Sequence, residues 1–243
     1  MHGQDPADDL TVSVVLPVRD DAPALERCLR ALAVQSVRPL EVVVVDDGSS
    51  DGSGDVARRG GAVVVREEEP GIAAAASRGY DAARGDLILR LDADSVPPPD
   101  WIARMTAPFV RDPGLAALSG PGVFSGLPTP LAGVLTRAYM GIYFRRIGAR
   151  IGSPPLFGSN LAMRRTAWEA VSAEVHRHDG HVHDDLDLTM HLLPRFRTGF
   201  EPTLVVPVSA RPLLHPFGML ERARRAAHTL RLHPDVRRDR LVR

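Results

Sequence analysis

The sequence contains no lysine and only one cysteine. All 30 of its basic residues are arginine, a side chain that suits two-pronged contacts with phosphate or carboxylate groups. Cys28 alone can form neither an intramolecular disulfide nor a cysteine-built metal site. Because 30 acidic residues balance the arginines, the net charge gives no indication of a nucleic-acid partner, and we expect none.

Long apolar segments are also absent. No stretch is long and uncharged enough to cross a bilayer, and the polar, acidic residues 1–9 contain no apolar signal core. These features predict a cytoplasmic protein. With 243 residues, of which 44% are hydrophobic and 25% charged, the chain is long enough for one globular domain with a sizeable core.

Asp92-Ala93-Asp94 is the most informative feature that the sequence does have. It follows an apolar run at 87–91 and precedes three prolines at 97–99, as expected for the end of a buried strand and a turn. Two carboxylates this close repel each other unless a cation lies near them. Mg²⁺ or Mn²⁺ would serve, and either would bring phosphate oxygens to the site. Taken alone, the motif fits a solvated acidic turn equally well.

Strands and helices alternate in the first part of the chain. Apolar runs at 12–18, 40–45, 62–65 and 87–91 predict strands, and segments 22–35 and 72–84 predict helices. This order predicts an α/β fold whose mainly parallel sheet is flanked by helices. Acidic residues follow three of the strands, whose carboxyl ends share one edge of a parallel sheet. We therefore expect six carboxylates at one cleft: Asp20, Asp21, Asp46, Asp47, Asp92 and Asp94.

The second part of the chain is less regular. It predicts helices at 101–110, 131–148, 185–193 and 216–232, with strands at 115–120, 157–163 and 204–208. No linker divides the chain. We expect a single domain over residues 1–243, with a nucleotide-binding half at 11–95, an acceptor half at 96–215, and a basic C-terminal helix and tail at 216–243.

Five motifs follow one another along the chain. They are Pro-Val-Arg-Asp-Asp at 17–21, Val-Val-Asp-Asp-Gly-Ser at 44–49, a glycine-bounded helix at 71–85 that leads to Asp-Ala-Asp, Gly-Ser-Asn-Leu-Ala-Met-Arg-Arg at 158–165, and His-Asp-Asp-Leu-Asp-Leu at 183–188. In this order and spacing the chain resembles the family 2 glycosyltransferases over about residues 12–211. The resemblance implies the GT-A fold and the inverting transfer of a sugar from a nucleotide-diphosphate donor.

The resemblance also implies roles for individual residues. Asp94 would bind the metal ion, Mn²⁺ or Mg²⁺, with Asp92 beside it as a second ligand or a ribose contact. Asp185 would be the general base that takes the proton of the acceptor hydroxyl. The donor-binding residues would be Pro17, Asp20, Asp21, Asp47, Gly48, Arg78 and Asp92. The acceptor side would include Ser159, Asn160, His183 and Asp184.

Several of these residues have a second interpretation. Asp184 and Asp185 would also suit the first turn of a helix, where acidic groups favour the helix dipole. Asn160 would suit a capped turn, and Arg78 an exposed helix surface. Four histidines lead into the acidic pair and suit either a zinc site or a polar loop: His176, His178, His181 and His183.

Two other functions stay open at this point. A nucleotidyltransferase that forms sugar nucleotides would have a related fold, but it would need a basic, glycine-rich loop where this chain has Arg-Asp-Asp-Ala-Pro at 19–23. A noncatalytic nucleotide-sugar-binding protein is suggested only by Ala76-Ser77, where the family often has Arg-Asn. The Gln-x-x-Arg-Trp motif of processive polymer synthases is absent, which favours single transfers.

The C-terminal segment 216–243 combines an apolar stripe with an excess of arginine. Together with the amphipathic segment 131–148, it would suit the surface of an anionic membrane and a lipid-linked acceptor at the inner face of that membrane. The other interpretation is that both helices pack on the sheet and the arginines face solvent. The basic rim would comprise Arg222, Arg224, Arg225, Arg231, Arg237, Arg238, Arg240 and Arg243.

Overall fold

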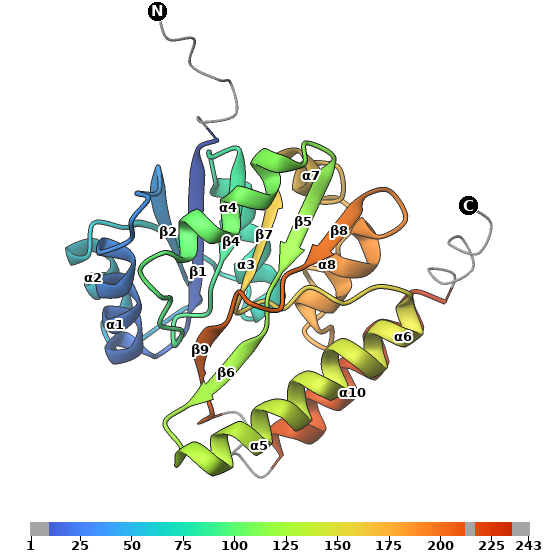
Figure 1. The fold of residues 1–243 in the computed structure, drawn as a ribbon. Coiled ribbons are helices and arrows are strands. Elements are labelled where there is room, and N and C mark those ends of the chain that lie inside the picture. Colours follow the sequence, from blue (N-terminus) through green and yellow to red (C-terminus); the bar gives the residue numbers. More distant parts are fainter. Residues whose placement is uncertain (1–9, 212–216, 235–243) are drawn as a thin grey trace, which may run out of the picture.

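The structure, a computed structural model, describes residues 10–211 and 217–234. Its main sheet has seven strands: β1 (Val12–Val18), β2 (Glu41–Asp46), β3 (Val63–Arg66), β4 (Leu87–Arg90), β5 (Leu115–Ser119), β7 (Leu161–Arg164) and β8 (Arg197–Phe200). They lie in the order β3-β2-β1-β4-β7-β5-β8 (Figure 1). All pairs are parallel except those of β7, which runs antiparallel to β4 and β5. The predicted α/β fold with a mainly parallel sheet is confirmed.

Helices cover both faces of this sheet. Successive residues of a strand point to opposite sides, so a strand can pack against helices on both faces. Val14 and Leu16 of β1 pack with α1 (Ala22–Ala33) and α4 (Trp101–Arg111). Val15 points the other way and packs with α3 (Ile72–Ala82), α7 (Arg165–Glu169) and α8 (Asp184–Leu192). The seven residues of β1 are all buried, as expected of a strand that is covered on both sides.

A second, two-stranded sheet pairs β6 (Gly122–Ser125) with β9 (Val206–Ser209). Beside it, α5 (Thr129–Met140), a π-helical segment (Gly141–Ile147) and α6 (Gly148–Ile151) follow one another directly and form one rod. The last described helix, α10 (Gly218–Leu232), runs along this rod (Figure 1). None of the helices that the structure describes is long and apolar enough to cross a membrane.

The sequence missed four short elements, which are β6, β8, α7 and α2 (Ser53–Arg59). The strand predicted at 157–163 begins only at Leu161, so that expectation was wrong at its start. The preceding residues form a loop instead, because the backbone N–H of Gly158 donates to Asp185 Oδ2 at 2.7 Å rather than to a neighbouring strand. The division of the chain at 95/96 and 215/216 stays a prediction.

Candidate active site

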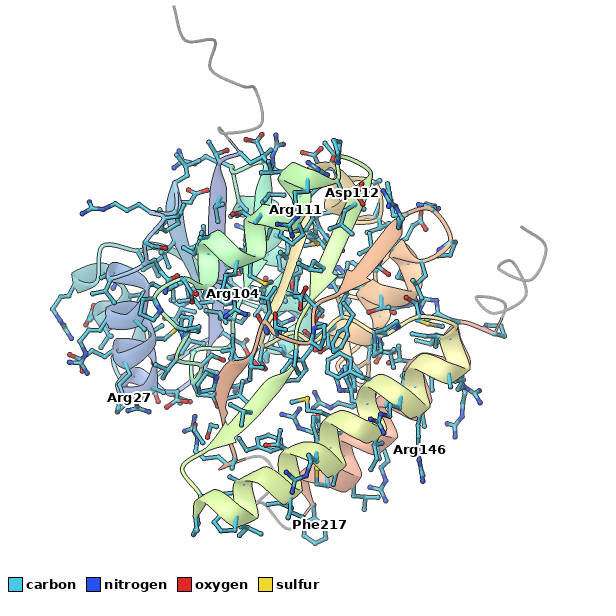
Figure 2. The ribbon with its side chains drawn as sticks, in the orientation of Figure 1. Arg27, Arg104, Arg111, Asp112, Arg146 and Phe217 are labelled. Atoms are coloured by element: carbon cyan, nitrogen blue, oxygen red, sulfur yellow. The ribbon has the colours of Figure 1, made fainter. Side chains whose placement is uncertain are left out.

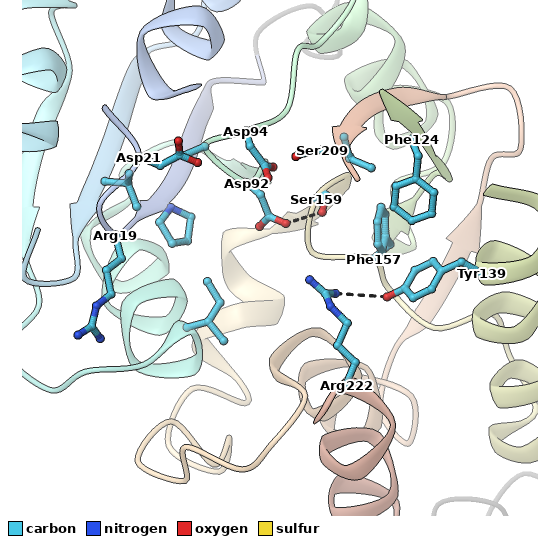
Figure 3. A pocket seen from close by; sticks show the side chains of 15 residues that line it. Arg19, Asp21, Asp92, Asp94, Phe124, Tyr139, Phe157, Ser159, Ser209 and Arg222 are labelled. Atoms are coloured by element: carbon cyan, nitrogen blue, oxygen red, sulfur yellow. Dashed lines mark hydrogen bonds between the residues drawn. The ribbon is translucent and has the colours of Figure 1, made fainter. Parts of the chain in front are cut away.

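Two adjoining cavities lie beyond the carboxyl ends of β1 and β4. The first has a volume of about 190 Å³ and is called here the Asp94 cavity (Figure 3). The second has a volume of about 480 Å³ and is called the Asp185 cavity. Both are lined by Ile72, Asp92, Phe157, Ser159 and Arg222. Because they share this wall, the two cavities are compartments of one cleft.

Two carboxylates in the Asp94 cavity lie in different surroundings. Asp92 is held by two donors: Ser159 Oγ donates to its Oδ2, and Arg90 Nη2 donates to its Oδ1 at 3.2 Å. Asp94 has a side chain that is only 20% exposed. Burial, followed by the neighbouring Asp92 carboxylate, raises the pKa of Asp94 from 3.8 to about 6. The charged form of Asp94 is therefore unfavourable in this cavity unless a further cation compensates it.

The Asp94 cavity fits a divalent cation. Arg211 Nη2 contacts Asp21 Oδ2 and lies 3.4 Å from Asp94 Oδ2, so a cationic group is already stable between these two carboxylates. Carboxylate oxygens such as those of Asp21, Asp92 and Asp94 are the ligands that Mg²⁺ and Mn²⁺ prefer. The donor set thus agrees with the metal predicted from the sequence.

The six predicted carboxylates do not all meet at this cleft. Asp21, Asp92 and Asp94 line the Asp94 cavity. The others accept hydrogen bonds from backbone N–H groups, Asp20 from Ser50 at 2.7 Å, Asp46 from Ser49 at 2.8 Å and Asp47 from Gly71 at 3.2 Å. The expectation of one six-carboxylate cleft is therefore corrected, because three of the acids fold the loops that follow β1 and β2.

The remaining predicted donor residues occupy different positions. Pro17 lies in the wall of the Asp94 cavity. Gly48 has a φ of +70°, a left-handed conformation that favours glycine and turns the chain after β2. Arg78 is exposed on α3 and lines neither cavity. For Arg78 the structure therefore agrees with the alternative of an exposed helix surface.

Asn160 departs most clearly from its predicted place on the acceptor side. It is fully buried. Trp101 Nε1 donates to its Oδ1 at 2.9 Å, and its Nδ2 donates to the carbonyl oxygens of Leu204 at 2.6 Å and Pro121 at 3.2 Å. With its polar atoms occupied in this way, Asn160 holds three segments of the chain together and lines neither cavity.

Arg90 is a site residue that the sequence analysis missed. It is the last residue of β4, and its side chain is 3% exposed. Its guanidinium contacts Asp184 Oδ2 through Nη1 and Asp92 Oδ1 through Nη2, and Nη1 lies 3.3 Å from the Tyr80 hydroxyl. One buried cation thus holds two carboxylates in the wall of the Asp185 cavity, and one of them, Asp92, also lines the Asp94 cavity. Its signal in the sequence was a charged residue inside an otherwise apolar run, since buried charges are almost always paired.

Asp185 is buried at the start of α8 and lines the cavity named after it. Tyr143 Oη donates to its Oδ1 at 2.9 Å, the Gly158 N–H donates to its Oδ2 at 2.7 Å, and His183 Nδ1 lies 2.5 Å from its Oδ1. Burial alone would raise the pKa of Asp185, but His183, the Gly158 N–H and Arg90 hold it well below its usual range. Asp185 is therefore a firmly oriented anion.

Asp184 and His183 precede Asp185 at the start of α8. Asp184 is the first residue of the helix, with a side chain that is 13% exposed, and it lines the Asp185 cavity. Burial alone would lower the pKa of His183, but the adjacent Asp185 carboxylate outweighs that effect and raises it. The His183 ring stacks 5.7 Å from that of Tyr143. The three side chains thus form a single charged cluster.

Arg222 of α10 was expected in a basic rim at the surface, and the structure corrects this. It is partly buried and lies in the wall that the two cavities share. Its Nη1 donates to the Tyr139 hydroxyl at 3.3 Å (Figure 3). The helical periodicity of residues 216–232 predicted an apolar side of the helix. It does not show which arginine faces the interior of the protein.

The four histidines between residues 176 and 183 do not converge. His178 Nδ1 lies 2.5 Å from Glu69 Oε2, and His181 is exposed. His183 faces Asp185, whereas His176 Nδ1 lies 2.8 Å from Asp187 Oδ1. A zinc site built from these four residues is therefore excluded.

Comparison with curated proteins gives matches to part of the chain. An undecaprenyl-phosphate 4-deoxy-4-formamido-L-arabinose transferase of Serratia proteamaculans is 38% identical over 104 residues, which are 39% of this chain and 32% of that protein. Glycosyltransferase AglE of Haloferax volcanii is 32% identical over 120 residues, 46% of this chain and 36% of its own. The chain thus matches only about a third of the length of these relatives.

Solved structures are similar over nearly the whole chain. Glucosyl-3-phosphoglycerate synthase from Mycobacterium tuberculosis has a TM-score of 0.67 at 20% identity, with 93% of this chain and 81% of that chain covered. The mannosyltransferase PcManGT from Pyrobaculum calidifontis, in complex with GDP-Man and Mn²⁺, has a TM-score of 0.59 at 24% identity, with 93% and 68% covered. At these identities the likeness shows the fold.

The family follows from a further match. The sequence profile of "Glycosyl transferase family 2" matches residues 13–171, which is more than half of the chain and includes nearly all of β1, the whole of β4 and the Asp92-Ala93-Asp94 motif in the wall of the Asp94 cavity. Fold, motif order and profile agree, and the chain belongs to glycosyl transferase family 2.

Proposed function

We propose that this protein is a metal-dependent, inverting glycosyltransferase that makes single transfers from a nucleotide-diphospho-sugar to an acceptor hydroxyl. The observation that carries the proposal is the two-compartment cleft, in which a carboxylate-lined cavity adjoins a cavity that contains an acidic pair. The donor would occupy the Asp94 cavity and the acceptor the Asp185 cavity. The Mn²⁺ and GDP-Man bound to PcManGT support a nucleotide-sugar donor and a divalent cation.

The residues around the Asp94 cavity suit the departure of a diphosphate. A bound Mn²⁺ or Mg²⁺, held by Asp94 and Asp92, would neutralise the charge of the leaving group. Arg222 lies in the wall shared by the two cavities, where its guanidinium would form bidentate hydrogen bonds with phosphate oxygens. Arg90 would keep Asp92 and Asp184 at fixed positions on either side of the reacting sugar.

We propose Asp185 as the general base of the transfer. Its three contacts fix the direction of the carboxylate, and it lines the cavity assigned to the acceptor. The same contacts occupy both of its oxygens and lower its basicity, which favours a second candidate. Asp184 is more exposed, lines the same cavity and has one close partner, Arg90. The two assignments make opposite predictions for single Asn variants.

The acceptor class that we propose is a lipid-linked molecule. Support comes from the relative named an undecaprenyl-phosphate transferase and from exposed apolar residues on α5 and at the start of α10, the helix that also contributes Arg222 to the cleft. Phe217, at the start of α10, is 68% exposed and points away from the molecule in Figure 2. Leu220 of α10 and Leu131 and Val134 of α5 are also exposed. A membrane contact along these two helices would bring the acceptor to the Asp185 cavity.

The proposal is tested by measuring the release of UDP or GDP from nucleotide sugars with and without Mn²⁺. We expect metal-dependent release, and we expect Asp94→Ala to abolish it together with Mn²⁺-dependent nucleoside-diphosphate binding. Asp100→Asn is the matched control, because it alters a carboxylate outside the cleft whose side chain is 56% exposed. Pyrophosphate formed from a nucleoside triphosphate and a sugar phosphate would identify a nucleotidyltransferase instead. Donor binding without any turnover would identify a noncatalytic protein.

A further inference from the structure

A second group of metal-type ligands lies outside the cleft. It consists of His176, Asp187, His191 and His233, whose ligand atoms all lie within 4.8 Å of one another. The group joins three parts of the chain, which are the loop before α8, α8 itself and the C-terminal end of α10. None of the four residues lines the Asp94 or the Asp185 cavity.

Asp187 is the centre of the group. It is 2% exposed, and its Oδ1 lies 2.8 Å from both His176 Nδ1 and His233 Nε2. The ring centroids of His191 and His233 are 4.7 Å apart. Asp187 and His191 are four residues apart on α8, the spacing at which two side chains share one face of a helix. Three imidazoles thus surround one buried carboxylate.

His191 supplies an independent observation. Its Nε2 is buried and has no hydrogen-bond partner among the described residues, and the nearest oxygen of the group, Asp187 Oδ1, is 3.7 Å away. Burial of a polar nitrogen without a partner is unfavourable, and such atoms are uncommon. Glu174 Oε2 lies 3.8 Å from its Nδ1, on the side away from Asp187.

We propose that His176, Asp187, His191 and His233 bind one Zn²⁺ ion in a closed, structural site. Tetrahedral zinc with bonds of about 2.0–2.1 Å to nitrogen and oxygen separates its ligand atoms by roughly 3.4 Å. The distances here, 2.8 and 3.7 Å with none above 4.8 Å, lie on both sides of that value. Four protein ligands leave no open position, so the site has a structural role.

The position of this site gives it a function in the molecule. His233 caps the end of α10, the helix that carries Arg222 and Arg225 into the cleft. Asp187 and His191 belong to α8, the helix that carries Asp185. A zinc ion at this point ties the two helices together and fixes the wall of the Asp185 cavity. The ion would take no direct part in the proposed reaction, because none of its four ligands lines either cavity.

The test uses the full chain, stripped of metal with a chelator and titrated with Co²⁺ alone. Tetrahedral Co²⁺ absorbs visible light strongly, whereas Co²⁺ in an octahedral all-oxygen site absorbs weakly, so the spectrum distinguishes this site from the Asp94 cavity. We expect one equivalent of strongly absorbing Co²⁺ that Zn²⁺ displaces and excess Mg²⁺ does not. Zinc should also raise the midpoint of thermal unfolding.

Variants locate the ion. His191→Ala and Asp187→Asn should each lose the strong absorption and the stabilisation by zinc. His178→Ala is the matched control, because this histidine lies in the same loop with its side chain 74% exposed, and it should behave like the unchanged protein. The same signals should persist in Asp94→Ala. Absence of a tetrahedral spectrum in the unchanged protein, or its persistence in both His191→Ala and Asp187→Asn, would overturn the proposal.

Discussion

Replacing Asp94 by asparagine should stabilise the metal-free protein. Burial and the Asp92 carboxylate raise the pKa of Asp94 from 3.8 to about 6, so the ionised form of Asp94 destabilises the folded protein. A carboxyl group with a raised pKa binds its proton more tightly in the folded than in the unfolded chain. Its contribution to the free energy of unfolding therefore falls as the pH rises from about 4 to about 6 and stays low above that.

The size of the effect follows from the two pKa values. They differ by about 2, and each pKa unit corresponds to roughly 1.4 kcal/mol. Because the side chain is 20% exposed, solvent screens part of this unfavourable interaction. We therefore expect Asp94→Asn to raise the free energy of unfolding by about 2–3 kcal/mol at pH 7.5. At pH 4 the carboxyl is largely protonated in the folded state, so the gain should nearly vanish.

Urea unfolding in the presence of a chelator, at pH 7.5 and pH 4, measures this difference. Asp100→Asn, an exposed acid outside the cleft, should change the free energy of unfolding little at either pH. Added Mn²⁺ should stabilise the unchanged protein but not Asp94→Asn. The reasoning is refuted if Asp94→Asn loses stability at pH 7.5, or if its gain is the same at both pH values. A stabilising change that abolishes activity would identify Asp94 as a residue retained for function at a cost in stability.

Three further predictions concern the other charged groups. Asp185→Asn should bind donor normally and lose transfer by roughly 10²–10⁴-fold; an active Asp185→Asn beside a dead Asp184→Asn would move the base to Asp184. Arg90→Met removes a buried cation from Asp184, which is 13% exposed, and from Asp92, which is 37% exposed and partly screened by solvent, so urea unfolding should show a loss of about 2–3 kcal/mol, and a loss below about 1 kcal/mol would mean that the ion pairs contribute little. In vesicle sedimentation, salt-sensitive binding to anionic but not neutral vesicles should disappear on truncation after His215; no binding at low salt would point to a soluble acceptor.

The sequence predicted the first half of the fold well because its signals are local. Val14 and Leu16 alternate with Val15 in one continuous apolar run, which is typical of a strand covered on both faces. The antiparallel direction of β7 has no local signal, since it depends on how the chain returns to β4 from residues far away in sequence. The loop at Gly158 likewise depends on a carboxylate 27 residues further on.

Residue types alone were a weaker guide to the site. Asp92 and Asp94 were predicted for the cleft because two acids one residue apart at a strand end repel each other unless a cation lies near them. Asn160 was placed on the acceptor side by resemblance, but its side chain satisfies backbone groups that only the folded chain brings near it. Arg222 was assigned to the surface because of the helical periodicity of its segment. A helical period shows that one side of a helix is apolar, and it does not show what the polar side faces.

The wall shared by the two cavities makes their ligands thermodynamically dependent on each other. Arg222 contributes to both cavities and rests on the Tyr139 hydroxyl. A ligand in the Asp94 cavity that draws the guanidinium away from Tyr139 also reshapes the Asp185 cavity. Linkage requires the reverse effect to be equal, so whatever a donor does to acceptor affinity, an acceptor does to donor affinity by the same factor. Binding in one compartment is thereby coupled to binding in the other through a single side chain.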